Sequence, residues 1–457
     1  MAFSVDGQRV VVVGAARSGV AAAELLVSRG ASVILTDLEP ALADESRLRE
    51  AGVQLELGEH RADTLMKADL IVVSPGVPYN QPLVAAAREA DVPVISEIEL
   101  ASRWLKGRVV AVTGTKGKST TTTLIGQILK ESGAKALVGG NIGVPLSAQV
   151  DQSTPDTIHV VEVSSFQLET TETFSPSIAV MLNFSPDHLD RHATVEEYAA
   201  AKKRIFANQR EQDWAVVNAD DVGALNLARE ARARRVEISA SGSIRDGIVI
   251  AGSMIARRTQ GADESLLPLS SVHVLGRHLW TDVLAAVAVA DLLGVRPQVM
   301  QSAIEGFTGL EHAFEPVMEI SGVWFVNDTK ATNVEAAERA IESVDSGLSV
   351  IMGGRFKGGD LRRLRMPLQE RKATVVAIGE SQALFHEALD DVVDVRDAET
   401  LDAAVRLAFA STEPGGTVLL APACSSFDMF RDYAERGRRF KEAVRGLASD
   451  VQRTREQ

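Results

Sequence analysis

The stretch GTKGKST at residues 114–120 carries the residue types and the spacing that bind a phosphate group. An apolar run, RVVAVT, precedes it and a helical pattern follows it, so the stretch lies between the end of a buried strand and the start of a helix. In such a loop the backbone N–H groups point at phosphate oxygens, Lys118 can meet the β- and γ-phosphates, and Ser119 can ligate Mg²⁺. The pattern predicts a phosphate site, and a glycine-rich turn without a ligand is the alternative.

Acidic and polar residues follow in the next two apolar runs. Glu162 lies among valines in 157–169, which we interpret as a strand. A carboxylate buried there without a partner is costly, and a metal ion near the phosphates would offset that cost. The run at 177–192 ends in the polar cluster NFSPDHLDRH, for which a turn with side-chain hydrogen bonds is the alternative.

The segment that follows predicts a helix with two differently oriented lysines. Thr194 and Glu197 have the spacing of a capping box, and EEYAAAKKRIF continues the helix. Tyr198 and Lys202 are four residues apart and share one face, whereas Lys203 points elsewhere. Lys202 is therefore either directed at the site or an ordinary solvent-facing lysine.

Length, charge and composition limit the class of protein. A chain of 457 residues is too long for one core, so two to four domains are expected. Its 45% hydrophobic and 24% charged residues are typical of a soluble globular protein, and a net charge of −14 argues against nucleic acid as a partner. The one cysteine, Cys424, excludes an internal disulfide and fits a cytoplasmic location. We expect the N-terminal valines to form a buried strand rather than a signal peptide or a membrane span.

The N-terminal part alternates short apolar strands with helical segments, which predicts a parallel sheet covered on both faces. RVVVV at 9–13 leads into GAARSG at 14–19, and SVILTD ends at Asp37. Ala16 stands where a dinucleotide-binding turn needs its second glycine, so another nucleotide or a structural turn is favoured over a nicotinamide site. Asp37 is still placed to accept a hydrogen bond from a ribose or a base.

A third block of the same kind covers the C-terminal part. Three apolar strands run into the polar loops NDTKATN, GGRFKGGD and PACSSFD. Ligands of open α/β sheets bind beyond the carboxyl ends of the strands. We therefore expect one ligand to be met by the side chains that follow these strands, namely Lys330, Thr332, Lys357 and Ser426.

Together these motifs resemble those of the Mur ligases. The chain contains, in the family's order, GTKGKST, VEVSSFQLE, NFSPDHLDRH, YAAAK, GLEHAFE, VNDTKATN, GGRFKGGD and PACSSFDMF. Within the family, DTKATN and PACSSFD are similar to the members that add D-glutamate. The resemblance implies an α/β protein of three domains, a Rossmann-like UDP-sugar domain (1–105), a central P-loop ATPase-type domain (106–308) and a Rossmann-like amino-acid domain (309–457).

The resemblance also implies an activity, the ATP-dependent ligation of D-glutamate to UDP-N-acetylmuramoyl-L-alanine through an acyl phosphate, in peptidoglycan precursor synthesis. ATP and two Mg²⁺ ions are implied as cofactors. We expect a cytoplasmic monomer that neither binds nucleic acid nor inserts into a membrane. The alternatives are a sister Mur ligase or folylpolyglutamate-type ligase for another amino acid, and a nucleotide-binding regulatory protein that has lost turnover.

Site residues are implied by their matching positions in the motifs. The implied nucleotide site consists of Gly114, Thr115, Lys116, Gly117, Lys118, Ser119, Thr120, Asp282 and Asp328. The implied contacts to the UDP substrate are Ser18, Asp37, Ser74, Gly76, Asn141 and His188. The implied amino-acid contacts are Lys330, Thr332, Lys357, Ser426 and Phe427. The implied catalytic residues are Lys118, Glu162, His188, Lys202 and Lys330. The implied metal ligands are Ser119, Glu162, His188 and, as a carbamate, Lys202.

Four features depart from the family's pattern. Lys116 stands where many relatives have Asn, and Thr329 replaces Ser in the DTKATN motif. The family's H-N-x-x-N motif has Leu279 and Asp282 at its two Asn positions, and an ionised Asp cannot donate to adenine ring nitrogens. Ala313 stands where relatives carry an Arg that faces the γ-phosphate. Two of these features, the pair Leu279 and Asp282 and the residue Ala313, concern the contacts to adenine and to the γ-phosphate.

Overall fold

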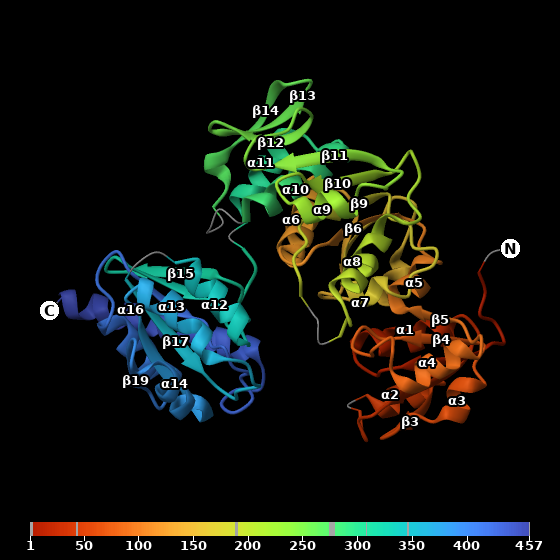
Figure 1. Cartoon of the computed structure of the whole chain (residues 1–457), viewed down its shortest axis with the longest axis horizontal. Coiled ribbons are helices and arrows are strands. Elements are labelled where there is room, and N and C mark those ends of the chain that lie inside the picture. Colours follow the sequence, from red (N-terminus) through yellow and green to blue (C-terminus); the bar gives the residue numbers. More distant parts are fainter. Residues whose placement is uncertain are drawn as a thin grey trace. The chain divides into compact units, whose positions relative to one another are not determined.

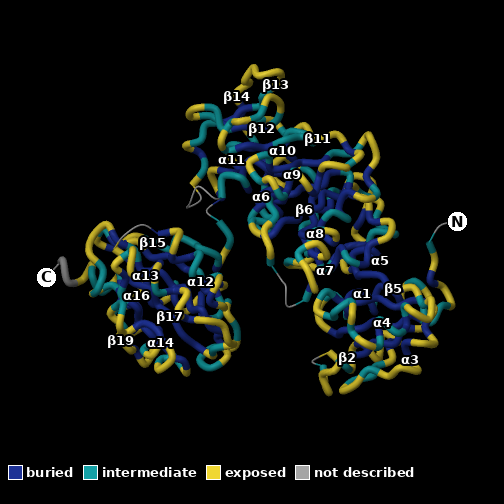
Figure 2. The backbone as a smooth tube through the Cα atoms, in the orientation of Figure 1, coloured by how far each residue is buried: buried dark blue, intermediate teal, exposed yellow. Residues whose placement is uncertain are grey.

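The computed structural model describes residues 3–42, 44–187, 191–273, 279–307, 309–344 and 347–456. The chain divides into two compact units: a first unit of Met1–His273 with His278–Phe307, and a second unit of Val274–Arg277 with Thr308–Gln457. Within the described residues, the first unit holds two β-sheets and the second unit holds one (Figure 1). Figure 2 shows that the interior of each sheet is buried, whereas edge strands such as β3 (Gln54–Leu57) and β19 (Asp394–Asp397) are mostly intermediate or exposed.

The central strands of the first sheet, β1 and β4, are apolar and mostly buried. The sheet has the order β3-β2-β1-β4-β5, and the fully buried valines of β1 pair in parallel with β2 and β4. Its strands are β1 (Arg9–Val13), β2 (Ser32–Asp37), β3 (Gln54–Leu57), β4 (Leu70–Val73) and β5 (Val94–Ser96). Its helices are α1 (Arg17–Ser28), α2 (Glu45–Glu50), α3 (Ala62–Met66), α4 (Pro82–Glu89) and α5 (Glu97–Ser102).

The second sheet has the order β14-β13-β12-β11-β10-β9-β6-β8-β7. Strands β6 to β12 all pair in parallel with their neighbours in this group. Strands β13 and β14 add an antiparallel extension at one edge. Its strands are β6 (Arg108–Thr113), β7 (Ala136–Gly140), β8 (Ile158–Glu162), β9 (Ile178–Met181), β10 (Trp214–Asn218), β11 (Arg234–Ser239), β12 (Gly247–Ala251), β13 (Met254–Thr259) and β14 (Ala262–Pro268). Its helices are α6 (Lys118–Glu131), η1 (Leu146–Gln152), α7 (Ser165–Leu168), α8 (Val195–Lys203), η2 (Arg204–Phe206), α9 (Val222–Leu227), η3 (Leu269–Ser271), α10 (Trp280–Leu292) and α11 (Pro297–Glu305).

The sheet of the second unit has the order β15-β16-β20-β17-β18-β19, and only its edge strand β15 is antiparallel among the strands described. Its strands are β15 (Glu315–Ile320), β16 (Val323–Asn327), β17 (Leu348–Gly353), β18 (Thr374–Ile378), β19 (Asp394–Asp397) and β20 (Thr417–Leu420). Its helices are α12 (Val334–Glu342), η5 (Leu361–Leu364), α13 (Arg365–Glu370), η6 (Gly379–Ser381), α14 (Gln382–Leu389), α15 (Leu401–Ala410) and α16 (Tyr433–Glu456).

The predicted fold class is confirmed, because all three regions are α/β with mainly parallel sheets. One predicted element is shorter than expected: the strand over 157–169 ends at Glu162, and α7 begins at Ser165. The reason is a reciprocal cap, in which Ser164 Oγ accepts from the Gln167 N–H while Gln167 Oε1 accepts from the Ser164 N–H. The domain limits at 105/106 and 308/309 stay predictions.

Candidate active site

The phosphate loop joins the end of β6 to the start of α6, as the sequence predicts. Gly117, the last loop residue, has a φ of 82°, a conformation that glycine adopts without strain. A Cβ on Gly117 would collide with Oδ1 of Asp282, which comes from α10. The structure therefore places Asp282 against the phosphate loop itself. Residue 117 must be glycine both because of its positive φ and because a Cβ would collide with Asp282.

Asn183 holds the outer part of this loop. Its Oδ1 accepts from the backbone N–H groups of Thr115 at 3.0 Å and Lys116 at 2.8 Å, and its Nδ2 donates to the Lys116 carbonyl at 3.1 Å. Asn183 follows β9, and the sequence marked it only as one member of a polar cluster. These hydrogen bonds fix the shape of the outer part of the loop.

Two lysines converge on the first residue of the loop. Lys118 Nζ donates to the carbonyls of Gly114 at 3.1 Å and Thr115 at 2.9 Å, and Lys202 Nζ donates to the Gly114 carbonyl at 2.7 Å. Lys202 shares a face of α8 with Tyr198, as predicted, and its ammonium lies 4.8 Å from the centre of the Tyr198 ring. Lys202 is 2% exposed, so it is not a solvent-facing lysine.

Burial changes the acid–base properties of both lysines. It lowers the pKa of Lys118 below the ordinary 10.5. It lowers the pKa of Lys202 to about 7, and the positive charge of Lys118 adds to this effect. Lys202 is thus an amine that can lose its proton near neutral pH.

Glu162 links the phosphate loop to the neighbouring strand end. Its Oε2 accepts from Ser119 Oγ at 2.6 Å and its Oε1 accepts from Asn141 Nδ2 at 2.8 Å. The Glu162 carboxylate is 2% exposed, and the two hydrogen bonds offset the free-energy cost that is expected for burying a carboxylate in this strand. The hydroxyl and the carboxylate together offer hard oxygen ligands next to Lys118.

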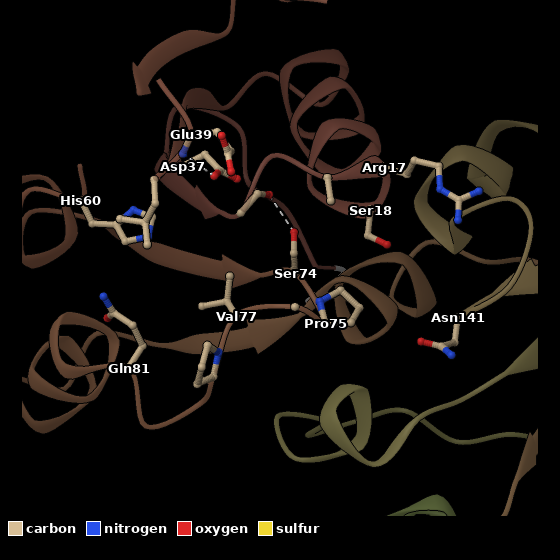
Figure 3. A pocket seen from close by; sticks show the side chains of 15 residues that line it. Arg17, Ser18, Asp37, Glu39, His60, Ser74, Pro75, Val77, Gln81 and Asn141 are labelled. Carbon is tan, nitrogen blue, oxygen red and sulfur yellow. Dashed lines mark hydrogen bonds between the residues drawn. The ribbon is translucent and has the colours of Figure 1, made fainter. Parts of the chain in front are cut away.

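A cavity of about 490 Å³ opens at the carboxyl edge of the first sheet (Figure 3). Figure 3 shows Asn141 entering it from the segment after β7, opposite the residues of the first sheet. Its lining includes all the described residues that the sequence assigned to the UDP substrate, Ser18, Asp37, Ser74, Gly76 and Asn141. Because Asn141 also bonds Glu162, the cavity and the phosphate loop are joined through one pair of side chains.

Internal hydrogen bonds shape the wall of this cavity. Asp37 accepts from the backbone N–H groups of Ala15 and Glu39. Ser74 Oγ donates to the Gly14 carbonyl at 2.7 Å. These bonds fix the turn GAARSG against β2 and β4, so the predicted turn is structural as well as a cavity wall.

Sequence reasoning missed several lining residues: Arg17, Leu38, His60 and Gln81. The pKa of His60 is lowered by burial, so its imidazole is neutral at pH 7 and bonded to Thr36 Oγ1 at 2.9 Å. Leu38 is 65% exposed although it is apolar, which suits a wall that contacts a flat ligand. Only the position of Arg17 inside the glycine-rich turn gave a signal in the sequence.

The second unit brings the predicted amino-acid residues to one edge of its sheet. Lys330 and Thr332 follow β16, Lys357 follows β17, and Ser426 with Phe427 follow β20. These three strands are neighbours, so the predicted convergence of the loops is observed. Both lysines are exposed, and within the described part of the chain neither ammonium has a hydrogen-bond partner.

Two further predicted positions lie beside these loops. Asp328 Oδ1 accepts from the Phe314 N–H at 3.1 Å, and burial raises the pKa of Asp328 to about 6. Ala313 lies between His312 and Phe314, both of which have positive φ values. His312 is 5% exposed, and its Nδ1 lies 3.0 Å from Asn327 Nδ2. Ala313 itself carries no charge, so it does not replace the Arg that relatives have at this position.

His188, predicted for the metal and the UDP substrate, lies outside the described residues. Among the residues that are described, no three His, Cys, Asp or Glu side chains gather closely enough to hold a metal ion. The described helices include none with the length and apolar character that crossing a lipid bilayer requires.

Comparison with known proteins gives the same family for all three regions. Three family models match: Mur ligase MurD-like N-terminal domain at residues 8–96, Mur ligase middle domain at 112–290, and Mur ligase glutamate ligase domain at 314–424. The UDP-N-acetylmuramoylalanine–D-glutamate ligase of Acidobacterium capsulatum is 46% identical over 455 residues, covering 98% of this chain and 99% of that protein. The protein of the same name from Koribacter versatilis is 44% identical over 453 residues, covering 98% and 99%.

A solved structure agrees at the level of the fold. The UDP-N-acetylmuramate–alanine ligase of Thermotoga maritima aligns with a TM-score of 0.59 at 20% identity, covering 96% of this chain and all of that one. The matched models span most of the chain, and the similarity to curated relatives extends from end to end. The chain belongs to the Mur ligase family, and within it to the group of UDP-N-acetylmuramoylalanine–D-glutamate ligases.

Proposed function

We propose that this protein joins D-glutamate to the alanyl carboxylate of UDP-N-acetylmuramoyl-L-alanine and consumes one ATP, as the names of its relatives indicate. A carboxylate resists attack by an amine, so it must first be activated. Transfer of the γ-phosphoryl group of ATP to the carboxylate gives an acyl phosphate. The amine of D-glutamate then attacks the carbonyl carbon, and phosphate leaves.

The observation that carries this proposal is the bonding of Glu162. This one carboxylate bonds Ser119 of the phosphate loop and Asn141 of the cavity wall, at 2.6 and 2.8 Å. A nucleotide on the loop and a substrate in the cavity would therefore meet across Glu162. Phosphoryl transfer between two bound molecules needs this proximity.

The chain's own groups supply the electrostatic part of catalysis. The backbone N–H groups at the start of α6 and the ammonium of Lys118 would contact phosphate oxygens, where negative charge builds up during transfer. Lys118 already bends back over the loop carbonyls, so contact with a phosphate needs only a rotation of its side chain.

The oxygen ligands fit the magnesium ions that we include in the proposal. Ser119 and Glu162 would hold one Mg²⁺, and Lys202 as a carbamate, with His188, would hold the second. Mg²⁺ takes few protein ligands and keeps waters and phosphate oxygens, so the hydroxyl of Ser119 and the carboxylate of Glu162 would suffice as protein ligands of one ion. When bound, the ions neutralise phosphate charge.

The amino-acid part of the proposal concerns the second unit. D-Glutamate carries two carboxylates, and the exposed ammonium groups of Lys330 and Lys357 at the sheet edge form no hydrogen bond or ion pair with the described residues. Thr332, Ser426 and Phe427 complete the proposed contacts. The proposal also takes residues 1–105, 106–308 and 309–457 as the three domains, and a monomer in the cytoplasm as the working form.

The test is a substrate screen with the purified full-length chain. Phosphate release and product mass should be measured with UDP-N-acetylmuramoyl-L-alanine, ATP, Mg²⁺ and a panel of D-glutamate, L-glutamate, L-alanine and diaminopimelate. We expect turnover with D-glutamate and a product heavier by one glutamyl residue. A preference for another amino acid would favour a sister ligase, and absence of turnover with every amino acid would favour a nucleotide-binding protein without catalysis.

A further inference from the structure

A single buried arginine lies at the base of the three loops of the second unit. Arg436, in the first turn of α16, is 1% exposed. Its Nε donates to Thr329 Oγ1 at 2.9 Å, and its Nη2 donates to the carbonyls of Thr329 and Cys424, both at 3.1 Å. Its Nη1 donates to the Gly353 carbonyl at 3.3 Å. The guanidinium thus binds backbone oxygens of three separate segments.

These segments follow adjacent parallel strands. Thr329 comes just after β16, Cys424 follows β20, and Gly353 is the last residue of β17; the sheet order is β16-β20-β17. The residues proposed to bind the amino acid come next in each segment, within four residues of the bonded carbonyl. A change at the guanidinium therefore reaches all three loops at once.

Close packing around the guanidinium leaves little room for adjustment. Thr329 Oγ1 accepts from Arg436 and donates to the Tyr433 carbonyl at 3.0 Å, which ties the loop to α16 twice. A Cβ on Gly437 would lie 2.7 Å from Thr329 Cγ2. The loops after β17 and β20 are also bonded to each other, because Arg355 and Ser425 exchange backbone hydrogen bonds. The edge is one connected network.

The choice of arginine at this buried position has a physical reason. Burial lowers the pKa of Arg436 to about 10, so the group is still charged at neutral pH. The four acceptors are neutral oxygens, and a buried charge without an ion pair is an expensive way to stabilise a fold. A planar fork of donors, however, fixes several acceptors in one plane at defined separations, which a lysine cannot do.

We propose that Arg436 is a positioning residue of the amino-acid site. It holds the three strand ends so that Lys330, Lys357 and Ser426 meet the carboxylates of the incoming amino acid at the correct separation. This inference rests on the proposed function, because that function assigns the amino acid to this edge.

The experiment compares Arg436→Lys with Arg439→Lys and the unchanged enzyme. Arg439 lies on the same helix but is exposed and paired with Glu442, so it is a matched control. KM should be measured for D-glutamate, ATP and the UDP substrate. We expect the KM for D-glutamate to rise about tenfold to a hundredfold in Arg436→Lys, since small misplacements of binding groups have effects of that size. The other two KM values should change less than about twofold on the same reasoning.

A second pair of variants tests the positioning role of Arg436 if Arg436→Lys does not fold. Thr329→Val removes the hydroxyl that accepts from Nε, and Thr329→Ser keeps it. Thr329→Val should raise the KM for D-glutamate severalfold and Thr329→Ser should restore it. ADP–ATP isotope exchange with the UDP substrate, which needs no amino acid, should persist in all these variants.

The outcomes separate the two proposals. Lack of D-glutamate turnover in the unchanged enzyme would refute the proposed function. Normal KM values for D-glutamate in folded Arg436→Lys or Thr329→Val, beside an active parent enzyme, would refute the positioning role alone. An equal rise of all three KM values would also refute it, because general loosening of the fold would then explain the effect.

Discussion

Depleting the enzyme of carbon dioxide should remove most of its activity, and bicarbonate should restore it. The reason is the environment of Lys202, whose pKa burial lowers to about 7. At pH 7.5 an ordinary lysine is about 0.1% neutral, whereas a lysine with a pKa of about 7 is about 75% neutral. Only the neutral amine attacks carbon dioxide, so burial raises the reactive fraction several hundredfold. The reaction forms an N–C bond, releases a proton and leaves an anionic oxygen ligand.

The assay has a direct and a functional part. The direct part is ¹³C NMR after incubation with ¹³C-bicarbonate, which should show one carbamate signal that is absent in Lys202→Ala. The functional part is phosphate release, in which Lys202→Ala should be nearly inactive and partly rescued by a small carboxylic acid that fills the vacated space. Lys203→Ala is the control, because the Lys203 side chain is 44% exposed and paired with Glu230. It should stay active and gain nothing from the acid.

Two results would contradict this reasoning. An unmodified Lys202 in an active enzyme supplied with bicarbonate would show that the lowered pKa serves another purpose. Full activity of Lys202→Ala would show that no anionic group is needed there.

Three other predictions follow from single side chains. Lys118→Ala should reduce phosphate release by a factor of about 10²–10³ or more with the fold intact, and Lys130→Ala on the exposed face of the same helix should not. Lys357→Ala should raise the KM for D-glutamate far more than the KM for ATP; equal changes would remove the amino acid from this loop. Glu97 is 0% exposed and burial raises its pKa to about 7, so the folded state holds a proton that the unfolded state loses near pH 4.5. Stability should therefore fall as pH rises from about 4.5 to 7, by about 3 kcal/mol in total, and urea unfolding of Glu97→Gln should lack this slope.

Several of the residues that the sequence identified share one property: they stand at the carboxyl ends of parallel strands. Glu162, Lys330, Lys357 and Ser426 could be found because an apolar run followed by polar residues fixes both the strand and its ligand-facing end. The partners that complete the sites come from elsewhere in the chain. Arg436 lies on a helix that begins after the last strand, and a helical pattern does not reveal which loops its buried face contacts.

Two further features of the first unit could not be predicted from the sequence. Asn183 belongs to a polar cluster that an ordinary turn explains equally well, and only the structure shows its clamp on Thr115 and Lys116. The antiparallel edge formed by β12, β13 and β14 was not predicted from the sequence either. It consists of two local hairpins, in which Ala251 pairs with Met254 and Thr259 pairs with Ala262 across two-residue turns.

Asp282 shows how a departure from the family's pattern can keep its chemistry. An ionised carboxylate against Gly117 would repel a phosphate, but Asp282 is 3% exposed and burial raises its pKa well above the ordinary value. Its Oδ2 has no hydrogen-bond partner among the described residues. The raised pKa favours the protonated acid, which has one O–H donor and one acceptor, as the amide of Asn has both.

Replacing Asp282 by the Asn of the family's motif tests this interpretation, because the two side chains predict different pH dependences of the KM for ATP. Below the raised pKa of Asp282, Asp282→Asn should bind ATP about as well as the parent enzyme, because both side chains are then neutral and carry a donor and an acceptor. As pH rises through the raised pKa of Asp282, the parent should acquire a negative charge beside the loop and its KM for ATP should increase, whereas the variant should show no such increase. The measurement is the KM for ATP across that pH range. If the parent and the variant respond alike, the carboxyl group is not the titrating group at the phosphate loop. If the variant binds ATP poorly even below that pKa, the O–H of Asp282 makes a contact that an amide cannot replace.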